Sequence, residues 1–306
     1  MREAEHDGFK VLDTFQIEQL SNHIKELSSD NMAGRKFSSA GSLLAQNYII
    51  NALKTSKVLP FQGNYQHTFI QNNLFNSKEG SNIIGFVKGT LFPDSFIVIS
   101  AHYDHLGQKG SKIYNGADDN ASGTAAVLTF AQYIAQTPFN HSIIFLFTDG
   151  EEVNLLGAKA FIKQNKSILP KVRINVNIDM IAGSKQTKKL HYIDNNLEKA
   201  FTKSNIQLFH NISAHNKFKA KRGFKRNINS ANTKTNWFNV SDHAVFNKID
   251  IPFVYFGVGE HKNYHTDKDN YNNINHSFYV EACQSILHYL QFLDSHIHST
   301  QKKLTN

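Results

Sequence analysis

The sequence has almost no cysteine and no long apolar segment, and both absences exclude whole classes of protein. Cys283 is the only cysteine among 306 residues, so neither an intrachain disulfide nor a zinc site built on several cysteines can form. No run of about 18 apolar residues occurs, which excludes a transmembrane helix. The first residues, MREAEHDGFK, lack the apolar segment of a signal peptide, although a processed secreted protein has the same appearance.

Positive charge exceeds negative charge, and much of the excess lies in one segment. Lysine and arginine number 33 against 25 aspartates and glutamates, a formal net charge of +8. Residues 215–226, HNKFKAKRGFKR, combine many of these basic residues with phenylalanine. Nucleic-acid-binding patches have this composition. However, a single basic loop without a binding fold is more often a solvated surface, so we expect no nucleic-acid partner.

Strand and helix patterns alternate along the chain and predict an α/β fold. Apolar residues at three- and four-residue spacing predict helices at 15–28, 40–55, 121–136, 157–165 and 277–297. Short β-branched or aromatic runs predict strands at 65–71, 81–89, 96–100, 142–148, 174–179 and 252–258. We therefore expect a mixed, mostly parallel central sheet with helices on both faces. Without repeats or linkers, one domain over 15–297 is predicted, with tails at 1–14 and 298–306.

Polar side chains follow four of the predicted strands, and the active sites of open α/β sheets collect at the carboxyl ends of their strands. These side chains are His102 and Asp104 after 96–100, Glu151 and Glu152 after 142–148, Asp179 at the end of 174–179, and His261 and His265 after 252–258. Carboxylates that line a cleft need cations to balance them, and no arginine or lysine directly adjoins the carboxylates of this set in the sequence.

This combination of side chains predicts a metal site. Imidazoles and carboxylates without thiolates match borderline-to-hard divalent metals, zinc first. Their number exceeds the three protein ligands of one catalytic zinc, which favours two ions that share a bridging carboxylate. Glu151 and Glu152 are neighbours, and neighbouring side chains of an extended segment point to opposite sides. One of them can then bind metal while the other serves as general base.

Five ordered segments, AHYDHLG, NGADDNASG, FTDGEEVNLLG, NIDMIAG and NYHTDKD, resemble the zinc-dependent M28 peptidases, the aminopeptidases with two zinc ions. SSDNMAGRKFSSAG and SDHAVFNKIDIPFVYF also resemble stretches of that family, so the resemblance spans about residues 18–290. It implies a hydrolase that cleaves N-terminal residues from peptides by attack of a metal-bound water, with Glu151 as general base.

The resemblance also implies a ligand set for two zinc ions per chain. His102 and Asp179 would bind one ion, Glu152 and His265 the other, and Asp119 both. The neighbouring Asp118 would be a bystander without a ligand role. The peptide bond between Asp119 and Asn120 is expected to be cis, as is typical of the family.

Other side chains near the motifs are expected either to support the ligands and the substrate or to have a structural position only. Asp104 is expected to orient the imidazole of His102. Tyr264 either donates a hydrogen bond to the tetrahedral oxyanion or is a packing tyrosine. Asp242 either orients a group of the site or binds the substrate amine. Three other residues are more typical of structural or surface positions: His105, His243 and His261. Glu260 either places an acid near the substrate amine or is a loop charge.

Three alternatives to an aminopeptidase stay open. The chain could be a glutaminyl cyclase-like enzyme with one zinc, a related carboxypeptidase or dipeptidase, or a non-catalytic binding module. The complete ligand set and the intact Glu151 favour hydrolysis of peptide substrates. Relatives are often secreted or periplasmic, which favours that compartment, and the sequence makes no prediction of oligomeric state.

Overall fold

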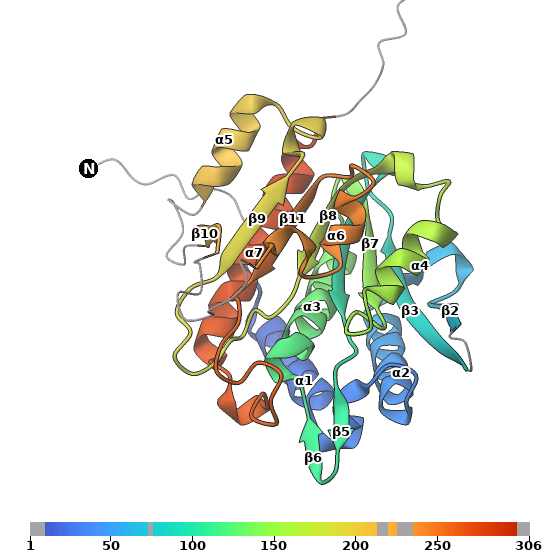
Figure 1. Ribbon diagram of the computed structural model, residues 1–306. Coiled ribbons are helices and arrows are strands. Elements are labelled where there is room, and N and C mark those ends of the chain that lie inside the picture. The colour runs from blue at the N-terminus through green and yellow to red at the C-terminus, as the bar shows by residue number, and fades with distance from the viewer. Residues whose placement is uncertain (1–9, 73–75, 213–219, 225–234, 299–306) are drawn as a thin grey trace, which may run out of the picture.

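A mixed sheet forms the centre of the molecule (Figure 1). The computed structural model describes residues 10–72, 76–212, 220–224 and 235–298. Within these ranges, nine strands form one sheet in the order β1-β3-β7-β4-β8-β11-β9-β10, with β2 paired to β3. Its four central strands are parallel to one another: β7 (His141–Thr148), β4 (Phe92–His102), β8 (Val172–Ile178) and β11 (Phe253–Gly257).

Antiparallel strands extend the sheet on both sides. On one side lie β1 (Leu59–Pro60), β2 (Gln66–Asn72) and β3 (Ser77–Val87), and on the other β9 (His191–Asn195) and β10 (Lys221–Arg222). β3 is antiparallel to β7 and β9 is antiparallel to β11, whereas β10 is parallel to β9. A separate hairpin consists of β5 (Gly107–Lys109) and β6 (Lys112–Tyr114).

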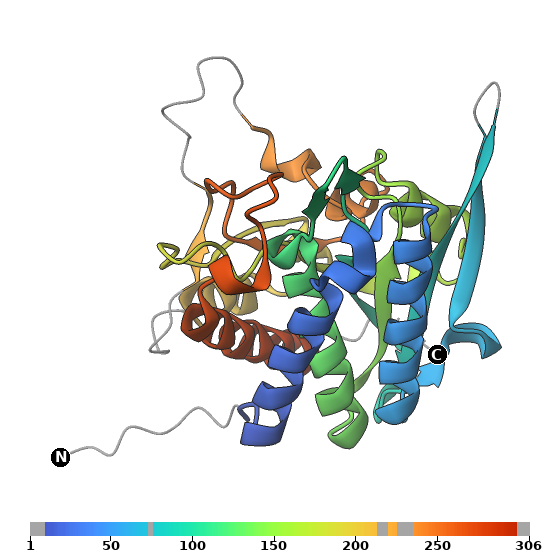
Figure 2. The ribbon, with the colours of Figure 1, turned by 90° about the horizontal axis from the view of Figure 1, so that it is seen from below.

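Helices cover both faces of the sheet because its central strands are apolar on both sides. Ile97 and Ile99 of β4 pack into the larger core, whereas Val98 packs into a second core on the opposite face. The larger core is covered by α1 (Thr14–Leu27), α2 (Ala40–Thr55), α3 (Gly123–Gln136) and α7 (His276–His296), which lie side by side in Figure 2. The second is covered by α4 (Leu156–Gln164) and α6 (His243–Asn247).

The predicted fold class is confirmed, with each predicted helix and strand present. Several short elements, among them α5 (Lys203–Asn211), α6 and β9, were not predicted, because a stretch of five to nine residues holds too few apolar positions to show a period. No helix in the described part of the chain is long and apolar enough to cross a membrane. Residues 1–9 and 299–306 of the predicted tails, and residues 215–219 and 225–226 of the basic segment, lie outside the described residues.

Arg35 holds together three segments that lead into the strand ends. Its side chain is fully buried in the turn-rich stretch between α1 and α2. The guanidinium donates hydrogen bonds of 2.5 to 3.0 Å to four main-chain carbonyl oxygens: those of Leu27, Tyr103, Asn115 and Gly116. These carbonyls belong to the end of α1, the residue after β4, and the turn before residue 117. One side chain therefore fixes the backbone on which several predicted site residues lie.

We expect Arg35→Met to destabilise the protein by about 3 kcal/mol or more, because it removes a charged donor from four main-chain carbonyl oxygens, and three of these contacts are fully buried. The matched control is Lys171→Met, since Lys171 is exposed and makes a 2.9 Å ion pair with the exposed Asp94. Loss of such a surface pair costs about 1 kcal/mol or less. Urea unfolding in the presence of a chelator measures both changes, and equal losses for the two variants would contradict the anchoring role.

Candidate active site

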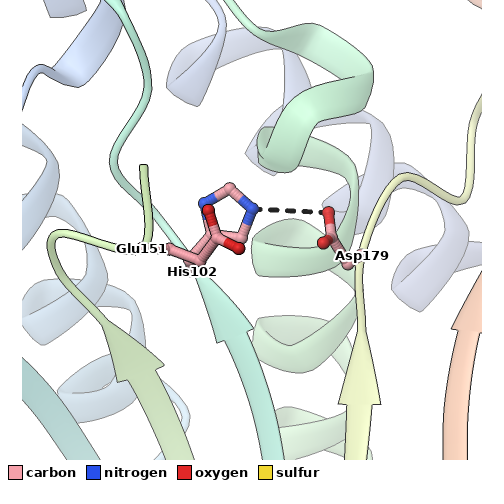
Figure 3. Close-up of side chains that lie close together, drawn as sticks. All are labelled: His102, Glu151 and Asp179. Carbon is pink, nitrogen blue, oxygen red and sulfur yellow. Dashed lines mark hydrogen bonds and ion pairs between the residues drawn. The ribbon is translucent and has the colours of Figure 1, made fainter. Parts of the chain in front are cut away.

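Three predicted site residues converge at the carboxyl ends of the parallel strands. His102 is the last residue of β4, Asp179 follows β8, and Glu151 lies in the turn after β7. Figure 3 shows their side chains pointing toward one another. Nε2 of His102 lies 3.3 Å from Oδ1 of Asp179, and each of the three offers a donor atom within 4.8 Å of the others.

Asp119 lies between two groups of donor atoms. Its Oδ1 is 3.4 Å from Nε2 of His102, and its Oδ2 is 3.1 Å from Nε2 of His265. The same nitrogen of His265 is 3.5 Å from Oε2 of Glu152. Ligands of a tetrahedral zinc lie at about 2.0 to 2.2 Å from the ion and thus roughly 3.3 to 3.6 Å from one another. We call His102, Asp119 and Asp179 the first donor group and Asp119, Glu152 and His265 the second. The contacts of 3.1 to 3.5 Å within these groups are close to that spacing, and imidazoles with carboxylates suit zinc.

The turn that carries Asp119 is anchored to the end of β8. It belongs to η3 (Ala117–Ser122), and the bond between Asp119 and Asn120 is cis, as predicted. The side chain of Asn120 donates a 3.0 Å hydrogen bond to the carbonyl of Ile178 and accepts one of 3.1 Å from the N–H of Met180. Asn120 therefore fixes the position of Asp119 relative to Asp179.

Asp104 positions the two glutamates more directly than it positions His102. Its carboxylate accepts the backbone N–H groups of Glu151 and Glu152 at 3.0 and 3.3 Å. Its Oδ1 is 3.7 Å from Nδ1 of His102, whereas that nitrogen lies 3.1 Å from the main-chain oxygen of Asp104. The carboxylate of Asp104 therefore lies at ion-pair distance from His102 and also holds the Glu151–Glu152 turn, while the main chain of Asp104 holds the imidazole. Its role in orienting His102 stays a prediction.

The two adjacent glutamates have opposite electrostatic surroundings. Burial raises the pKa of Glu151 well above its usual range; His102 opposes this rise, and the nearby carboxylates, Asp179 first, add to it. Burial also acts to raise the pKa of Glu152. Hydrogen bonds from His105 and His265 outweigh burial and lower it far below the usual range. Glu152 is therefore held as a carboxylate, whereas Glu151 has a high proton affinity.

His105 is a buried partner of Glu152. Its Nδ1 lies 2.8 Å from Oε1 of Glu152 and 3.7 Å from Oδ2 of Asp119. The shorter distance is that of a hydrogen bond and is less than the spacing between two ligands of one zinc ion. His105 thus orients Glu152 from inside the protein, which agrees with a structural position and not with a surface one.

Asp242 is completely buried beside the site, so it is not exposed to a substrate amine. Its Oδ2 accepts a short hydrogen bond from the hydroxyl of Thr148, and within the described residues its Oδ1 has no partner. Burial raises the pKa of Asp242 to about 7, and the charge of His102 opposes this rise. Of its two predicted roles, orientation of a neighbouring group fits the structure.

Tyr264 is half-buried, and its ring stacks on the imidazole of His265 at a centroid distance of 3.8 Å. Burial and the nearby carboxylates, Asp119 first, raise the pKa of the phenol, so its hydroxyl remains a donor. The stacking is consistent with a packing role, and the donor is consistent with a role toward an oxyanion.

A positive charge lies beneath the site, although the sequence analysis found no lysine or arginine beside the predicted ligands. Burial lowers the pKa of Arg35 to about 10, and the charges of Asp269, Asp119, Asp104 and Glu152 oppose this, in that order. Arg35 is 67 residues before His102 in the chain, so local sequence gives no sign of it. Its stretch, SSDNMAGRKFSSAG, was noted only as part of the family resemblance.

Asp269, which was not predicted from the sequence, holds the backbone around Asp119. Asp269 accepts the N–H groups of Asp118 and Asp119 at 2.9 and 3.0 Å. Asp118 points away from the donor groups, as expected of a residue without a ligand role. It is nevertheless fully buried and lies 2.8 Å from Nε2 of His261. The description of Asp118 as a bystander is therefore wrong.

Comparison with known proteins agrees with this arrangement. Residues 82–290 match the sequence profile of peptidase family M28. The chain is 29% identical over 123 residues to aminopeptidase YwaD of Bacillus subtilis, which covers 39% of this chain and 26% of YwaD. It spans less than half the length of the curated relatives it matches.

Solved structures with the same fold include enzymes of two kinds. The glutaminyl cyclase of Fimbriiglobus ruber is 18% identical, with a TM-score of 0.72 over 95% of this chain and 99% of that one. A zinc aminopeptidase of Bacillus subtilis is 16% identical, with a TM-score of 0.68 over 90% of this chain and 95% of that one. These likenesses show the fold alone.

The profile match covers both donor groups, from the end of β4 to the loop that follows β11, and extends into α7. Together with the donor atoms gathered at the strand ends, it shows that this chain belongs to peptidase family M28.

Proposed function

We propose that the protein is an aminopeptidase that holds two zinc ions and removes N-terminal residues from peptides. The observation that carries this proposal is the position of Asp119, whose two carboxylate oxygens face two different histidines at 3.4 and 3.1 Å. His102 and Asp179 would hold one ion with Asp119, and Glu152 and His265 the other. When bound, zinc polarises a carbonyl oxygen and lowers the pKa of water to about 7.

Glu151 is the residue best suited to move the proton in this reaction. It lies in the turn after β7 beside His102 and Asp179, and burial raises its pKa. A general base works best when its pKa lies near the working pH. In hydrolysis, its carboxylate would take the proton of the attacking water and then give it to the departing amine. The backbone contact from Asp104 keeps Glu151 in place during both steps.

A glutaminyl cyclase-like activity is the second candidate, because glutaminyl cyclases have the same fold over nearly their whole length. Such an enzyme would need one ion, held by Asp119, Glu152 and His265. The first donor group, His102 with Asp179 and Oδ1 of Asp119, would then have no metal to bind. The presence of this complete first donor group, in addition to the one at Glu152 and His265, favours the aminopeptidase. Related carboxypeptidases and dipeptidases stay open, and release of C-terminal residues from N-acetylated peptides would reveal a carboxypeptidase.

Metal analysis and a substrate panel test the proposed reaction. We expect about two zinc ions per chain and release of the first residue from peptides with a free N-terminus. N-acetylated peptides should be resistant, because their amine is blocked. One zinc per chain together with cyclisation of N-terminal glutamine would contradict the aminopeptidase proposal and support a glutaminyl cyclase. Release of C-terminal residues from N-acetylated peptides would indicate a carboxypeptidase.

Glu151→Gln tests the assigned base. The amide keeps the size of the side chain but accepts no proton, so we expect kcat to fall by about 10² to 10⁴-fold. Zinc content and KM should change little, because Glu151 is not among the expected ligands. The control is Glu198→Gln, an exposed glutamate of η5 (Leu197–Lys199) outside the site, which should leave kcat unchanged. If Glu151→Gln turned over substrate at nearly the wild-type rate, the assignment of Glu151 as general base would be wrong.

Removal of single donors tests the two-ion arrangement. We expect His102→Ala and His265→Ala each to lower the zinc content from about two to about one per chain, because each histidine serves only one donor group. Asp119→Ala should weaken both ions, since its oxygens serve both groups. His210→Ala, on α5 outside the site, is the control. Equilibrium dialysis followed by elemental analysis gives the stoichiometries, and two ions in His102→Ala would contradict the assignment.

A further inference from the structure

Asp118 connects three segments that carry expected zinc ligands. It precedes Asp119 in the chain. Its Oδ1 accepts the backbone N–H groups of Ala182 and Gly183, three and four residues after Asp179, at 2.7 and 2.8 Å. Its Oδ2 is 2.8 Å from Nε2 of His261, four residues before His265. The side chain of Asp118 is completely buried and that of His261 nearly so.

The hydrogen bonds of His261 define its orientation and its protonation. Nδ1 of His261 accepts the backbone N–H of Asn263 at 3.2 Å, so this nitrogen carries a lone pair. The proton of the neutral ring is then on Nε2, where it is donated to Asp118. The carbonyl oxygen of His261 also accepts the N–H of Tyr264 at 3.0 Å. His261 thus fixes the turn that leads directly into His265.

The loop from His261 to Asp269 is attached to η3 at both of its ends. Asp118 holds its beginning through His261, and Asp269 holds its end through the N–H groups of Asp118 and Asp119. His265 lies between these attachments, has a positive φ of 54° and is more than a third exposed. The ring stacked on its imidazole is that of Tyr264, which belongs to the same loop, so the position of His265 depends on how the two ends of the loop are held.

We propose that Asp118 and His261 form a positioning pair that holds the loop carrying His265, and so sets the affinity of the zinc ion bound by His265 and Glu152. The proposal rests on the zinc site of the proposed function and adds residues that do not touch the metal. Groups that orient metal ligands typically contribute 10- to 100-fold in metal affinity.

The test is competition between the full-length protein and a chromophoric zinc chelator, which gives the dissociation constants of both ions. We expect His261→Ala to weaken one ion by about 10- to 100-fold and to leave the other unchanged. His261→Gln, whose amide nitrogen reaches a position similar to Nε2, should restore most of the affinity. Asp118→Asn should weaken the same ion, and the double variant with His261→Ala should be no weaker than either single variant.

Two backgrounds show which ion is affected. In His102→Ala, the ion that remains is the one expected at His265, and His261→Ala should weaken it. In His265→Ala, the ion that remains is the other one, and His261→Ala should have no effect. This contrast separates the positioning role from a general loss of stability, which would weaken both ions.

The protein contains a matched control pair at the opposite end of β7. Asp294 accepts the backbone N–H groups of Asn140 and His141 at 2.8 Å, and its Oδ1 is 3.0 Å from Nδ1 of His141. Both residues are buried, as Asp118 and His261 are. His141→Ala should therefore lower the midpoint of urea unfolding to a similar extent while both zinc affinities remain those of the wild type.

Three results would overturn the proposal. They are unchanged zinc affinities in both His261→Ala and Asp118→Asn, an equal loss for both ions, and a loss in His141→Ala as large as in His261→Ala. If His261→Ala does not fold, His261→Gln and Asp118→Asn decide by the same criteria. Zinc binding that depends on His261 in a protein without aminopeptidase activity would contradict the proposed function while leaving the positioning pair intact.

Discussion

Repulsion among buried carboxylates is the constraint on which the rest of the site depends. Asp119, Glu151, Glu152 and Asp179 lie together at one edge of the sheet, where the dielectric response is low and like charges destabilise one another strongly. The folded chain offsets this repulsion from three directions. Histidine rings lie between the carboxylates, backbone N–H groups point at the supporting aspartates, and the guanidinium of Arg35 lies beneath them. A divalent cation adds the charge that these groups leave uncompensated, which is why the arrangement favours metal.

The parallel sheet is what brings these groups together. β7, β4, β8 and β11 are neighbours in space, and a different polar residue of the site lies at the carboxyl end of each strand or in the segment that follows it. The apolar strands are fixed by burial on both faces, so the residues just beyond their ends have little freedom to move. Hydrogen bonds between neighbouring segments then hold the turns that carry the expected ligands. Asn120 links η3 to β8, and Asp104 links the end of β4 to the Glu151–Glu152 turn.

The parts of the site that sequence predicts are those that follow directly from strand ends. His102, Glu152 and Asp179 could be placed near one another because each comes at or just after an apolar run. The ligand role of Asp119 and the choice of His265 over His261 needed the family resemblance. The hydrogen bonds that hold the ligands in place could not be predicted from the sequence, because they join residues far apart in the chain. Asp118 and His261 are 143 residues apart, and Asp269 holds the backbone of Asp118 across 151 residues. Contacts between residues so far apart leave no periodic pattern in the sequence. Arg35 lies in a polar, turn-rich stretch, where the sequence alone predicts an exposed side chain.

Adjacent glutamates with opposite proton affinities explain how one short turn can serve two purposes. Glu151 and Glu152 are chemically identical and share the support of Asp104, so only their surroundings distinguish them. Histidines donate to Glu152 and stabilise its charge, whereas Glu151 faces other carboxylates and retains its affinity for a proton. Groups whose pKa values are pushed apart in this way are typical of acid–base catalysis. A shared fold does not determine the reaction. In this chain the reaction would depend on whether both oxygens of Asp119 hold a metal, because His102, which would bind the second ion, lies beside Glu151.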